Sequence, residues 1–379
     1  MICPSPTRKL RRVRNTEGMK KLDSTATNLL PRSVMQAQSR VRIPQLPGVI
    51  GTFMGRDALA LALSALKLGQ QDTVLLPAYT CQEVLKSFAT RVNIEFYDVC
   101  ADLTIDPDEL RPRLKRKKVG MLLITDYFGF LQPSRRELRK LCDEHGASLI
   151  EDCAHSLLTE GAGETGDYAI FSLRKLLHVP DGGGLRVNKR DTSLAPEFYP
   201  SLYSNILSVT AIIKSGLNIH SEMLSRARVA STTQSLVPRV TDSNEKERTL
   251  PLSYFTRTGM TKASFNEVIR KRREDFLFWQ ELCANNRSLI PLFTDLPAHV
   301  CPFGFPVLVE KRTALEDRVR RSGIPLSVHW RLDRTLAPEC TVSQDLSTRM
   351  LTLPLFPHLA DKQREVLAKL LSEESLHRD

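Results

Sequence analysis

The sequence predicts an α/β protein: a large domain with a mostly parallel sheet flanked by helices, and a smaller α+β domain after it. Three observations support this fold class. Helix-like and strand-like segments alternate from Gly55 to Asn188. The segment 119–125 is apolar throughout, which is typical of a strand buried on both faces of a sheet. After residue 250 a long helix and short strands replace the alternation.

The predicted elements of the large domain follow an extended lead-in at 43–53. An Ala/Leu-rich helix ends at Gly69, and a short strand is closed by Pro77. The helix that starts at Pro107 has proline in its first turn and a basic end, as the helix dipole favours. In chain order we expect helices at 58–68, 81–90, 107–115 and 133–145, and strands at 73–76, 94–99, 119–125, 148–151, 169–172 and 185–188.

The second half of the chain lacks the regular alternation of helices and strands. An apolar helix is expected at 202–213 and a polar connection at 231–248. A long helix at 265–286 precedes strands at 305–309, 324–328 and 350–353 and helices at 312–322 and 360–371. We therefore predict a basic, disordered extension at 1–42, a large domain at 43–250 and a small domain at 251–379.

Composition excludes several classes of protein. The chain of 379 residues is 41% hydrophobic and 26% charged, as ordinary globular proteins are. No apolar run approaches the roughly 20 residues of a membrane span, and nothing resembles a secretory signal. The eight cysteines form no Cys-x-x-Cys pair, so neither a metal site nor a redox motif is expected. We expect a cytoplasmic protein with reduced thiols.

The net charge of +11 suggests nucleic acid at first sight, but eight of these charges lie in residues 1–43. That basic tail is either a contact for nucleic acid or an anionic membrane, or a solvated extension with Met19 as the true start. We favour the second interpretation, and expect neither nucleic acid nor membrane as a partner.

The residues that carry chemistry are concentrated in 147–188. Asp152 follows an apolar strand, and Lys175 lies in the apolar run 171–177. Burial lowers the pKa of a lysine, which suits a Schiff-base amine, whereas a surface lysine is the structural alternative. A carboxylate such as Asp152 can pair with a protonated ring nitrogen, or it can cap a helix. Together they indicate the two ends of a pyridoxal phosphate (PLP) site.

Hydroxyl and cationic groups near Lys175 suit a phosphate. Ser172 lies three residues before it, next to Arg174. Gly182 and its two neighbours allow close backbone approach, or form a simple hairpin turn. A second phosphate contact is expected at the helix start formed by Arg56 and Asp57, where free N–H groups are available; Asp57 as a helix cap is the alternative.

Two further side chains are assigned more loosely. His155 can hydrogen-bond Asp152 or the phenolate oxygen of the cofactor, or serve as a structural donor. Tyr79 follows the strand that ends at Pro77, so it can lie over the cofactor ring or pack in the core.

The run from Gly55 to Asn188 resembles the DegT/StrS family of sugar aminotransferases, which are PLP enzymes of fold type I. The matching stretches are GRDALALAL, DTVLLPAYTC, LLITDYFGF, HGASLIEDCAHSL, GDYAIFSLRKLL and PDGGGLRVN. The resemblance extends more loosely over 263–372. Cys81 stands where many members carry an aromatic residue, and Ser172 is closer to Lys175 than is usual in the family.

The resemblance implies that Lys175 forms the internal aldimine, that Asp152 binds the pyridine nitrogen and that His155 lies near the phenolate oxygen. Ser172 and the amides of Arg56 and Asp57 would bind the phosphate. It further implies a homodimer that moves an amino group from an amino acid, most simply glutamate, to a keto-sugar nucleotide. A PLP-dependent dehydratase or lyase of the same fold, and a non-catalytic regulatory protein that kept the fold, are the alternatives.

Overall fold

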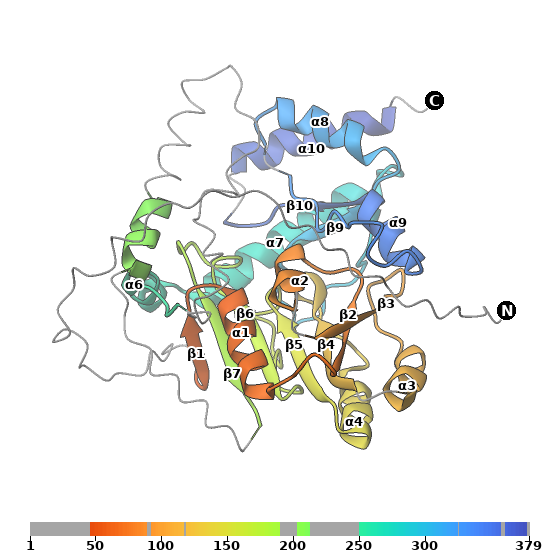
Figure 1. The fold of residues 1–379 in the computed structure, drawn as a ribbon. Helices are drawn as coiled ribbons and strands as arrows, with labels where there is room; N and C mark the ends of the chain where they lie inside the picture. Colours follow the sequence, from red (N-terminus) through yellow and green to blue (C-terminus); the bar gives the residue numbers. More distant parts are fainter. Residues whose placement is uncertain are drawn as a thin grey trace, which may run out of the picture. The chain divides into compact units, whose positions relative to one another are not determined.

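The computed structural model describes residues 46–88, 92–116, 119–189, 203–212, 250–324, 326–357 and 361–376. The predicted extension at 1–42 and the predicted connection at 231–248 lie outside these ranges. The described residues form a seven-stranded sheet and a three-stranded sheet with helices around them (Figure 1). The larger sheet is mostly parallel and the smaller one is antiparallel, so the predicted fold class is confirmed.

The larger sheet has the strand order β1-β7-β6-β5-β4-β2-β3. Its strands are β1 (Val49–Thr52), β2 (Thr73–Pro77), β3 (Asn93–Tyr97), β4 (Val119–Thr125), β5 (Ser148–Cys153), β6 (Tyr168–Ser172) and β7 (Gly183–Val187). Strands β2 to β6 run parallel, whereas β7 is antiparallel to both β6 and β1. The short connection from β6 to β7 leaves no room for the crossover that a parallel pair needs.

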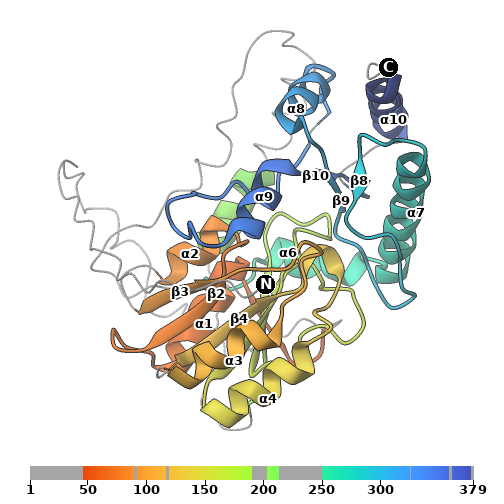
Figure 2. The ribbon, with the colours of Figure 1, turned by 90° about the vertical axis from the view of Figure 1, so that its right-hand side faces the viewer.

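Helices cover both faces of this sheet, because successive side chains of a strand point to opposite faces. On β4, Met121 and Leu123 pack in the cluster that contains the apolar face of α1 (Gly55–Leu66). Leu122 and Ile124 pack in the cluster on the other face. That second face is covered by α3 (Pro107–Arg116) and α4 (Arg135–His145), seen in front of the strands in Figure 2. The short α2 (Gln82–Phe88) lies on the α1 side.

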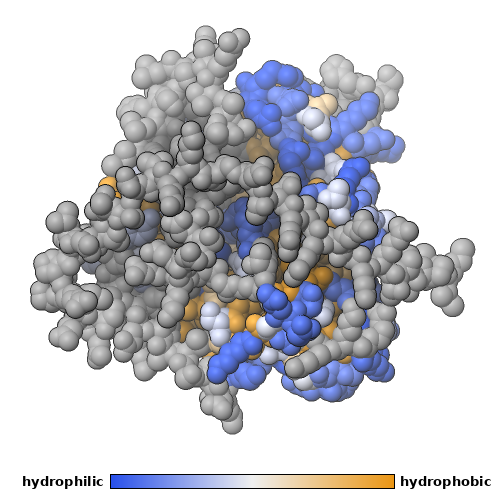
Figure 3. All heavy atoms as spheres, viewed as in Figure 1, coloured by the Kyte–Doolittle hydropathy of each residue, from blue (hydrophilic) through white to orange (hydrophobic). Residues whose placement is uncertain are grey.

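The smaller sheet has the order β10-β9-β8 and consists of β8 (Ile290–Pro291), β9 (Phe305–Leu308) and β10 (Met350–Leu353). It packs against Trp279 of α7 (Phe265–Ala284), Leu315 of α8 (Arg312–Arg321) and Leu367 of α10 (Asp361–Leu376). Where α8 lies in Figure 1, the surface in Figure 3 is hydrophilic. None of the described helices is long and apolar enough to cross a membrane.

Two predictions about the second half need correction. The described residues of the expected strand at 324–328, namely 324 and 326–328, form no strand, since only Ser327 among them makes an isolated bridge, to Thr352. The helices α6 (Tyr254–Lys262) and α9 (Thr341–Arg349) were not predicted. Both sequences are short and polar with β-branched residues, so local preference for a helix is weak and tertiary contacts decide. The expected helix at 202–213 is present over the described residues 203–212.

A buried carboxylate joins three distant segments beside the β6–β7 connection. Asp181 is fully buried, and its Oδ2 accepts hydrogen bonds from Ser208 Oγ and Ser253 Oγ, both at 2.5 Å. The Ser253 backbone N–H donates to its Oδ1 at 3.2 Å. Asp181 therefore holds helix 203–212 and the start of α6 against the loop that carries Lys175.

Candidate active site

The predicted site residues meet at the carboxyl ends of the parallel strands. The chain leaves β2 for β3 at one edge and then returns to place β4 on the other side of β2. Such a reversal of strand order opens a crevice outside the carboxyl ends of the strands. Tyr79 follows β2, Asp152 lies near the end of β5, and Ser172 ends β6. The topology thus brings residues separated by almost a hundred positions to one edge.

Lys175 and Asp152 form an electrostatically coupled pair that is largely, though not completely, sheltered from solvent. Burial lowers the pKa of the Lys175 amine, and the neighbouring Asp152 opposes that shift. Burial likewise raises the pKa of Asp152, and Lys175 counteracts it. The carboxylate is oriented by the Ala154 backbone N–H, which donates to Asp152 Oδ1 at 3.0 Å. The site therefore presents an amine with a lowered pKa beside an oriented acid.

Ser172 and the start of α1 lie together because glycines remove the side chains between them. A Cβ on Gly183 would lie 2.3 Å from the Met54 carbonyl, so only glycine allows β7 to run this close to α1. A Cβ on Gly55 would be 4.0 Å from the Ser172 Cβ. Ser172 Oγ makes no hydrogen bond to any residue that the structure describes. Its hydroxyl and the first N–H groups of α1, which lack intrahelical acceptors, are available together.

Two arginines add positive charge at the same place. The charge of Arg56 lowers the pKa of Arg174, secondary to the effect of burial. Arg56 also makes an exposed ion pair with Glu83 at 3.1 Å. Mutual repulsion between two guanidinium groups is relieved by an anion, and a helix N-terminus favours the same charge. The Ser172 hydroxyl, the α1 N-terminus and the two arginines have the chemistry of a phosphate site.

Asp57 acts as a helix cap, the alternative that the sequence left open. Its Oδ2 accepts a hydrogen bond from the Met54 backbone N–H at 2.8 Å, and its own N–H donates to the Met54 carbonyl at 3.0 Å. Burial raises the pKa of Asp57 to about 6. Both polar groups of Asp57 are thus used within the first turn, which leaves the amides of Gly55 and Arg56 for a ligand. The contact of Asp57 with a cofactor stays a prediction.

His155 is buried, and its ring stacks on Phe303 with centroids 3.9 Å apart. Burial and the nearby Lys175 charge lower the pKa of His155 far below its usual range, so the imidazole is neutral. Its Nδ1 faces the Phe128 backbone N–H at 3.4 Å, whereas its buried Nε2 has no hydrogen-bond partner in the described part of the chain. A buried polar atom without a partner is rare and indicates a missing ligand or water.

Tyr79 is fully buried in an aromatic layer with Tyr127 and Trp330, at centroid distances of 5.9 and 5.5 Å. Its hydroxyl donates to Met350 Sδ at 3.2 Å. The structure therefore gives Tyr79 a packing role between the two sheets, and its contact with a cofactor stays a prediction.

The structure adds three residues that the sequence did not single out, all from the second half of the chain. Phe303 lies 5.8 Å from Lys175 Nζ, measured to the ring centroid. Trp330 stacks on His155 at 5.4 Å, and His329 lies 5.6 Å from the same ring, edge to face. These contacts join residues about 130 to 175 positions apart, and no local pattern distinguishes them from ordinary core residues.

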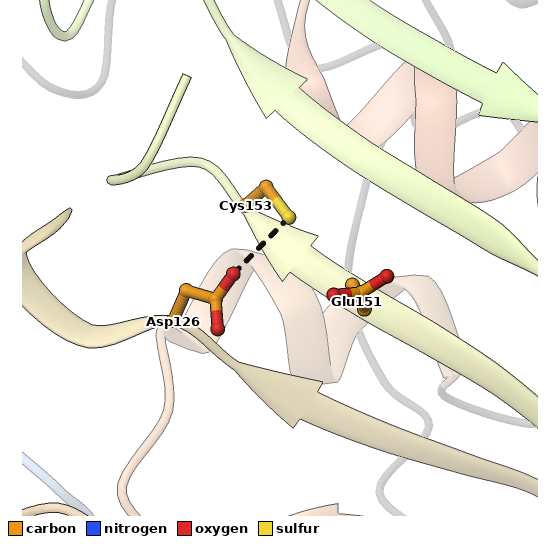
Figure 4. A group of neighbouring side chains, drawn as sticks. All are labelled: Asp126, Glu151 and Cys153. Carbon is orange, nitrogen blue, oxygen red and sulfur yellow. Dashed lines mark hydrogen bonds between the residues drawn. The ribbon is translucent and has the colours of Figure 1, made fainter. Parts of the chain in front are cut away.

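A second polar group lies behind the site, on the opposite face of β5 from Asp152. Asp126, Glu151 and Cys153 are fully buried, with potential ligand atoms within 4.8 Å of one another (Figure 4). Cys153 Sγ donates to Asp126 Oδ2 at 3.4 Å, and Ser156 Oγ donates to the same oxygen at 3.3 Å. Burial raises the pKa of the Cys153 thiol, so it keeps its proton and serves Asp126 as a donor. This group is therefore a hydrogen-bonded cluster of the core.

The donor set fits PLP. An amine of lowered pKa suits its aldehyde, and an acid beside the amine suits its ring nitrogen. The unpartnered Nε2 of His155 suits its phenolate oxygen, and the hydroxyl, helix start and arginines described above suit its phosphate ester. Each polar part of the cofactor has a complementary group in this crevice.

The fold matches that of solved aminotransferases of PLP fold type I. Residues 47–196 match the DegT/DnrJ/EryC1/StrS aminotransferase family. These residues span β1 to β7 and include every predicted site residue. The resemblance found in the sequence is therefore confirmed.

Two curated relatives are similar to this chain. GDP-perosamine synthase of Vibrio cholerae is 31% identical over 147 residues, which cover 36% of this chain and 39% of that protein. UDP-N-acetyl-3-dehydro-alpha-D-glucosamine 3-aminotransferase of Acidithiobacillus ferrooxidans is 24% identical over 350 residues, covering 86% and 84% of the two chains. The first similarity spans well under half of the relative, whereas the second extends into the small domain.

Solved structures share the fold over most of the chain. A DegT/DnrJ/EryC1/StrS aminotransferase from Brucella abortus superposes with a TM-score of 0.61 at 18% identity, covering 86% of each chain. NtdA from Bacillus subtilis, solved with bound cofactor PMP, gives a TM-score of 0.61 at 16% identity and covers 86% of this chain and 72% of that one. At these identities the structures support the fold alone.

Proposed function

We propose that this protein is a PLP-dependent aminotransferase that moves an amino group from an amino acid, most simply glutamate, to a keto-sugar nucleotide. The observation that carries the proposal is the coupled pair of Lys175 and Asp152 at the carboxyl edge of the parallel sheet, next to the phosphate-like site around Ser172. Two curated relatives whose names specify nucleotide-linked sugars support the acceptor class.

The residues would hold the cofactor at both ends. Lys175 Nζ provides the covalent anchor, and the Asp152 carboxylate accepts a hydrogen bond from the ring nitrogen. Ser172 Oγ and the first N–H groups of α1 bind the phosphate, and Arg56 and Arg174 balance its charge. When bound, PLP supplies an aldehyde that condenses with amines and a pyridinium ring that withdraws electrons from the attached carbon.

Lys175 also moves the proton. Burial lowers the pKa of its amine, which favours the neutral form that can take a proton. With PLP and the donor bound, Lys175 Nζ would be the group that takes the proton from the α-carbon of the donor. Burial raises the pKa of Asp152, while the Lys175 charge and the Ala154 N–H oppose that shift and favour the carboxylate.

Trapping with borohydride tests the covalent step directly. The purified protein is incubated with PLP, reduced, digested and analysed by mass spectrometry. We expect the cofactor mass on the peptide that contains Lys175 and no such mass in Lys175→Ala, with Lys175→Arg as the variant that keeps the charge. A cofactor bound to another lysine would contradict the assigned anchor.

Turnover tests the reaction class. Wild-type protein loaded with PLP should form one 2-oxoglutarate per site from glutamate, and Lys175→Ala should slow this by about 10³-fold or more, since both covalent and proton-transfer roles are lost. Asp152→Asn should weaken the reaction while leaving the borohydride product on Lys175. A protein that binds PLP but forms no 2-oxoglutarate from glutamate, and transfers no amino group from other amino acids, would instead favour a dehydratase or a non-catalytic protein.

A further inference from the structure

The segment 327–330 brings a neutral imidazole from the small domain into the site. His329 is surrounded by Phe128, Phe303 and His155, at centroid distances of 5.7, 5.3 and 5.6 Å. All three rings meet it edge to face, at interplanar angles of 79 to 87°. The position of the His329 ring is therefore fixed by packing on several sides.

One nitrogen of the His329 ring is hydrogen-bonded within the protein, whereas the other has no hydrogen-bond partner among the described residues. His329 Nδ1 lies 2.9 Å from Thr352 Oγ1 on β10, in a hydrogen bond whose direction depends on the tautomer. Nε2 has no hydrogen-bond partner among the described residues, and it is absent from the buried polar atoms that lack one. Nε2 is therefore not fully sealed from solvent, and the contact with His155 and the influence of the Lys175 charge place the ring beside the candidate site.

The charge state of His329 restricts what it can bind. Burial, and then the charge of Lys175, lower the pKa of His329 to about 3, so the ring is uncharged at physiological pH. An uncharged imidazole does not neutralise the carboxylate of an amino acid donor. It does donate to, or accept from, a hydroxyl or carbonyl oxygen, which are the polar groups of a sugar ring.

We propose that His329 Nε2 contacts a hydroxyl or carbonyl oxygen of the acceptor's sugar ring, while the Nδ1 bond to Thr352 holds the imidazole in place. The Thr352 hydroxyl can donate or accept, so it supports either tautomer and leaves Nε2 free to match the oxygen it meets. His329 is thus a substrate-binding residue, and Thr352 is a positioning residue.

Since this assignment rests on the proposed function, the two half-reactions are measured separately. The donor half-reaction is followed as 2-oxoglutarate formed per site from glutamate. The acceptor half-reaction is followed as amino sugar formed from UDP- and GDP-linked keto-hexoses by protein that has already received its amino group. Thermal melts confirm that each variant is folded.

The side-chain amides of glutamine and asparagine separate a binding role from a structural one. His329→Gln places a polar group near the position of Nε2, whereas His329→Asn keeps one near Nδ1 and the bond to Thr352. We expect His329→Asn and His329→Ala to lower kcat/KM for the acceptor about 10-fold or more, the loss of one hydrogen bond. We expect His329→Gln to stay within about threefold of wild type, with the donor half-reaction unchanged in all three.

Trp330 gives a second readout that does not depend on turnover. It is 5.8 Å from His329, whereas the other tryptophan of the chain, Trp279, is buried in the small-domain core and contributes a constant background. Titration with the reactive sugar nucleotide should change the emission of wild type, and His329→Ala should weaken the apparent affinity about 10-fold.

Three other outcomes would contradict the proposal, each at a different step. A His329→Asn variant that matches wild type while His329→Gln is impaired, or an equal fall of both half-reactions, would show that His329 is structural. Donor turnover with no transfer to any nucleotide-linked keto-hexose would overturn the sugar assignment. If wild type itself forms no 2-oxoglutarate, the proposed function fails first, whatever the His329 variants do.

Discussion

Replacing Asp126 by asparagine should make the stability of this protein less sensitive to pH. Asp126 and Glu151 are two fully buried acids, and one carboxylate oxygen of Glu151 is turned toward Asp126 (Figure 4). Burial, and then the charge of Glu151, raise the pKa of Asp126 from 3.8 to about 7. The native protein therefore favours the protonated form of Asp126.

The magnitude follows from this shift. One pKa unit corresponds to about 1.4 kcal/mol, so ionising Asp126 in the native protein costs about 4 kcal/mol. A raised native pKa means that the native state binds the proton more tightly than the unfolded chain does. The stabilisation is complete below pH 3.8 and is lost as the pH rises through about 7. Between pH 5 and pH 8 the free energy of unfolding should fall by about 3 kcal/mol.

Urea unfolding at pH 5, 6, 7 and 8 measures this effect. Asp126→Asn keeps an oxygen for the Gln132 backbone N–H, which now donates to Asp126 Oδ1 at 2.9 Å. The variant has no proton to lose, so its free energy of unfolding should fall by about 3 kcal/mol less than that of wild type over this range. Asp57, whose pKa is raised to about 6, contributes the same sign in both proteins and cancels in the difference.

Asp108→Asn is the matched control, because the Asp108 side chain is 82% exposed. It should follow the wild-type pH dependence. If the free energy of unfolding falls equally with pH in wild type and in Asp126→Asn, the reasoning is refuted and the proton is held elsewhere in the cluster.

Three further substitutions test how the site is supported. Asp181→Ala should lower the free energy of unfolding by about 3 kcal/mol in urea melts, because two buried seryl hydroxyls lose their acceptor. Unchanged stability would show that Asp181 does not link α6 to the loop that carries Lys175. Gly183→Ala should weaken PLP binding, measured by fluorescence titration, because the added Cβ collides with the Met54 backbone. The control Gly259→Ala in α6 should bind PLP normally, because its Cβ makes only an ordinary contact, at 3.4 Å. Arg272→Met should cost about 3–5 kcal/mol in thermal or urea melts, because its buried guanidinium is the donor to three backbone carbonyls; a loss below about 1 kcal/mol would contradict that role.

Much of the large domain could be predicted from local sequence. The apolar run 119–125 is β4 with unchanged bounds, and the segment from Pro107 is α3. These elements are specified by hydrophobic period, proline and charge within one segment. In the small domain the expected strand at 324–328 failed, because a single bridge from Ser327 to Thr352 does not extend into a ladder.

Part of the candidate site could also be predicted, because its residues lie in short local sequence patterns. Asp152, Ser172 and Lys175 lie within one stretch of the chain, and the strands that carry two of them are neighbours in the sheet. Asp57 and Tyr79 are also where the sequence placed them, but their polar groups bond to Met54 and Met350. Which of two plausible partners a side chain takes depends on tertiary neighbours that the local sequence does not specify.

The sequence by itself determined the fold class, the resemblance to an aminotransferase family and the candidate lysine–acid pair, because strand patterning and the spacing of short motifs are local properties. Only the tertiary structure brought His329 and Phe303 against His155 and joined Nδ1 of His329 to Thr352. These contacts arise from packing between two sheets distant in the chain, and packing is set by shape and volume across the whole core. The proposed anchor for the cofactor was therefore visible in the sequence, whereas the proposed contact for the acceptor became visible only in the folded chain.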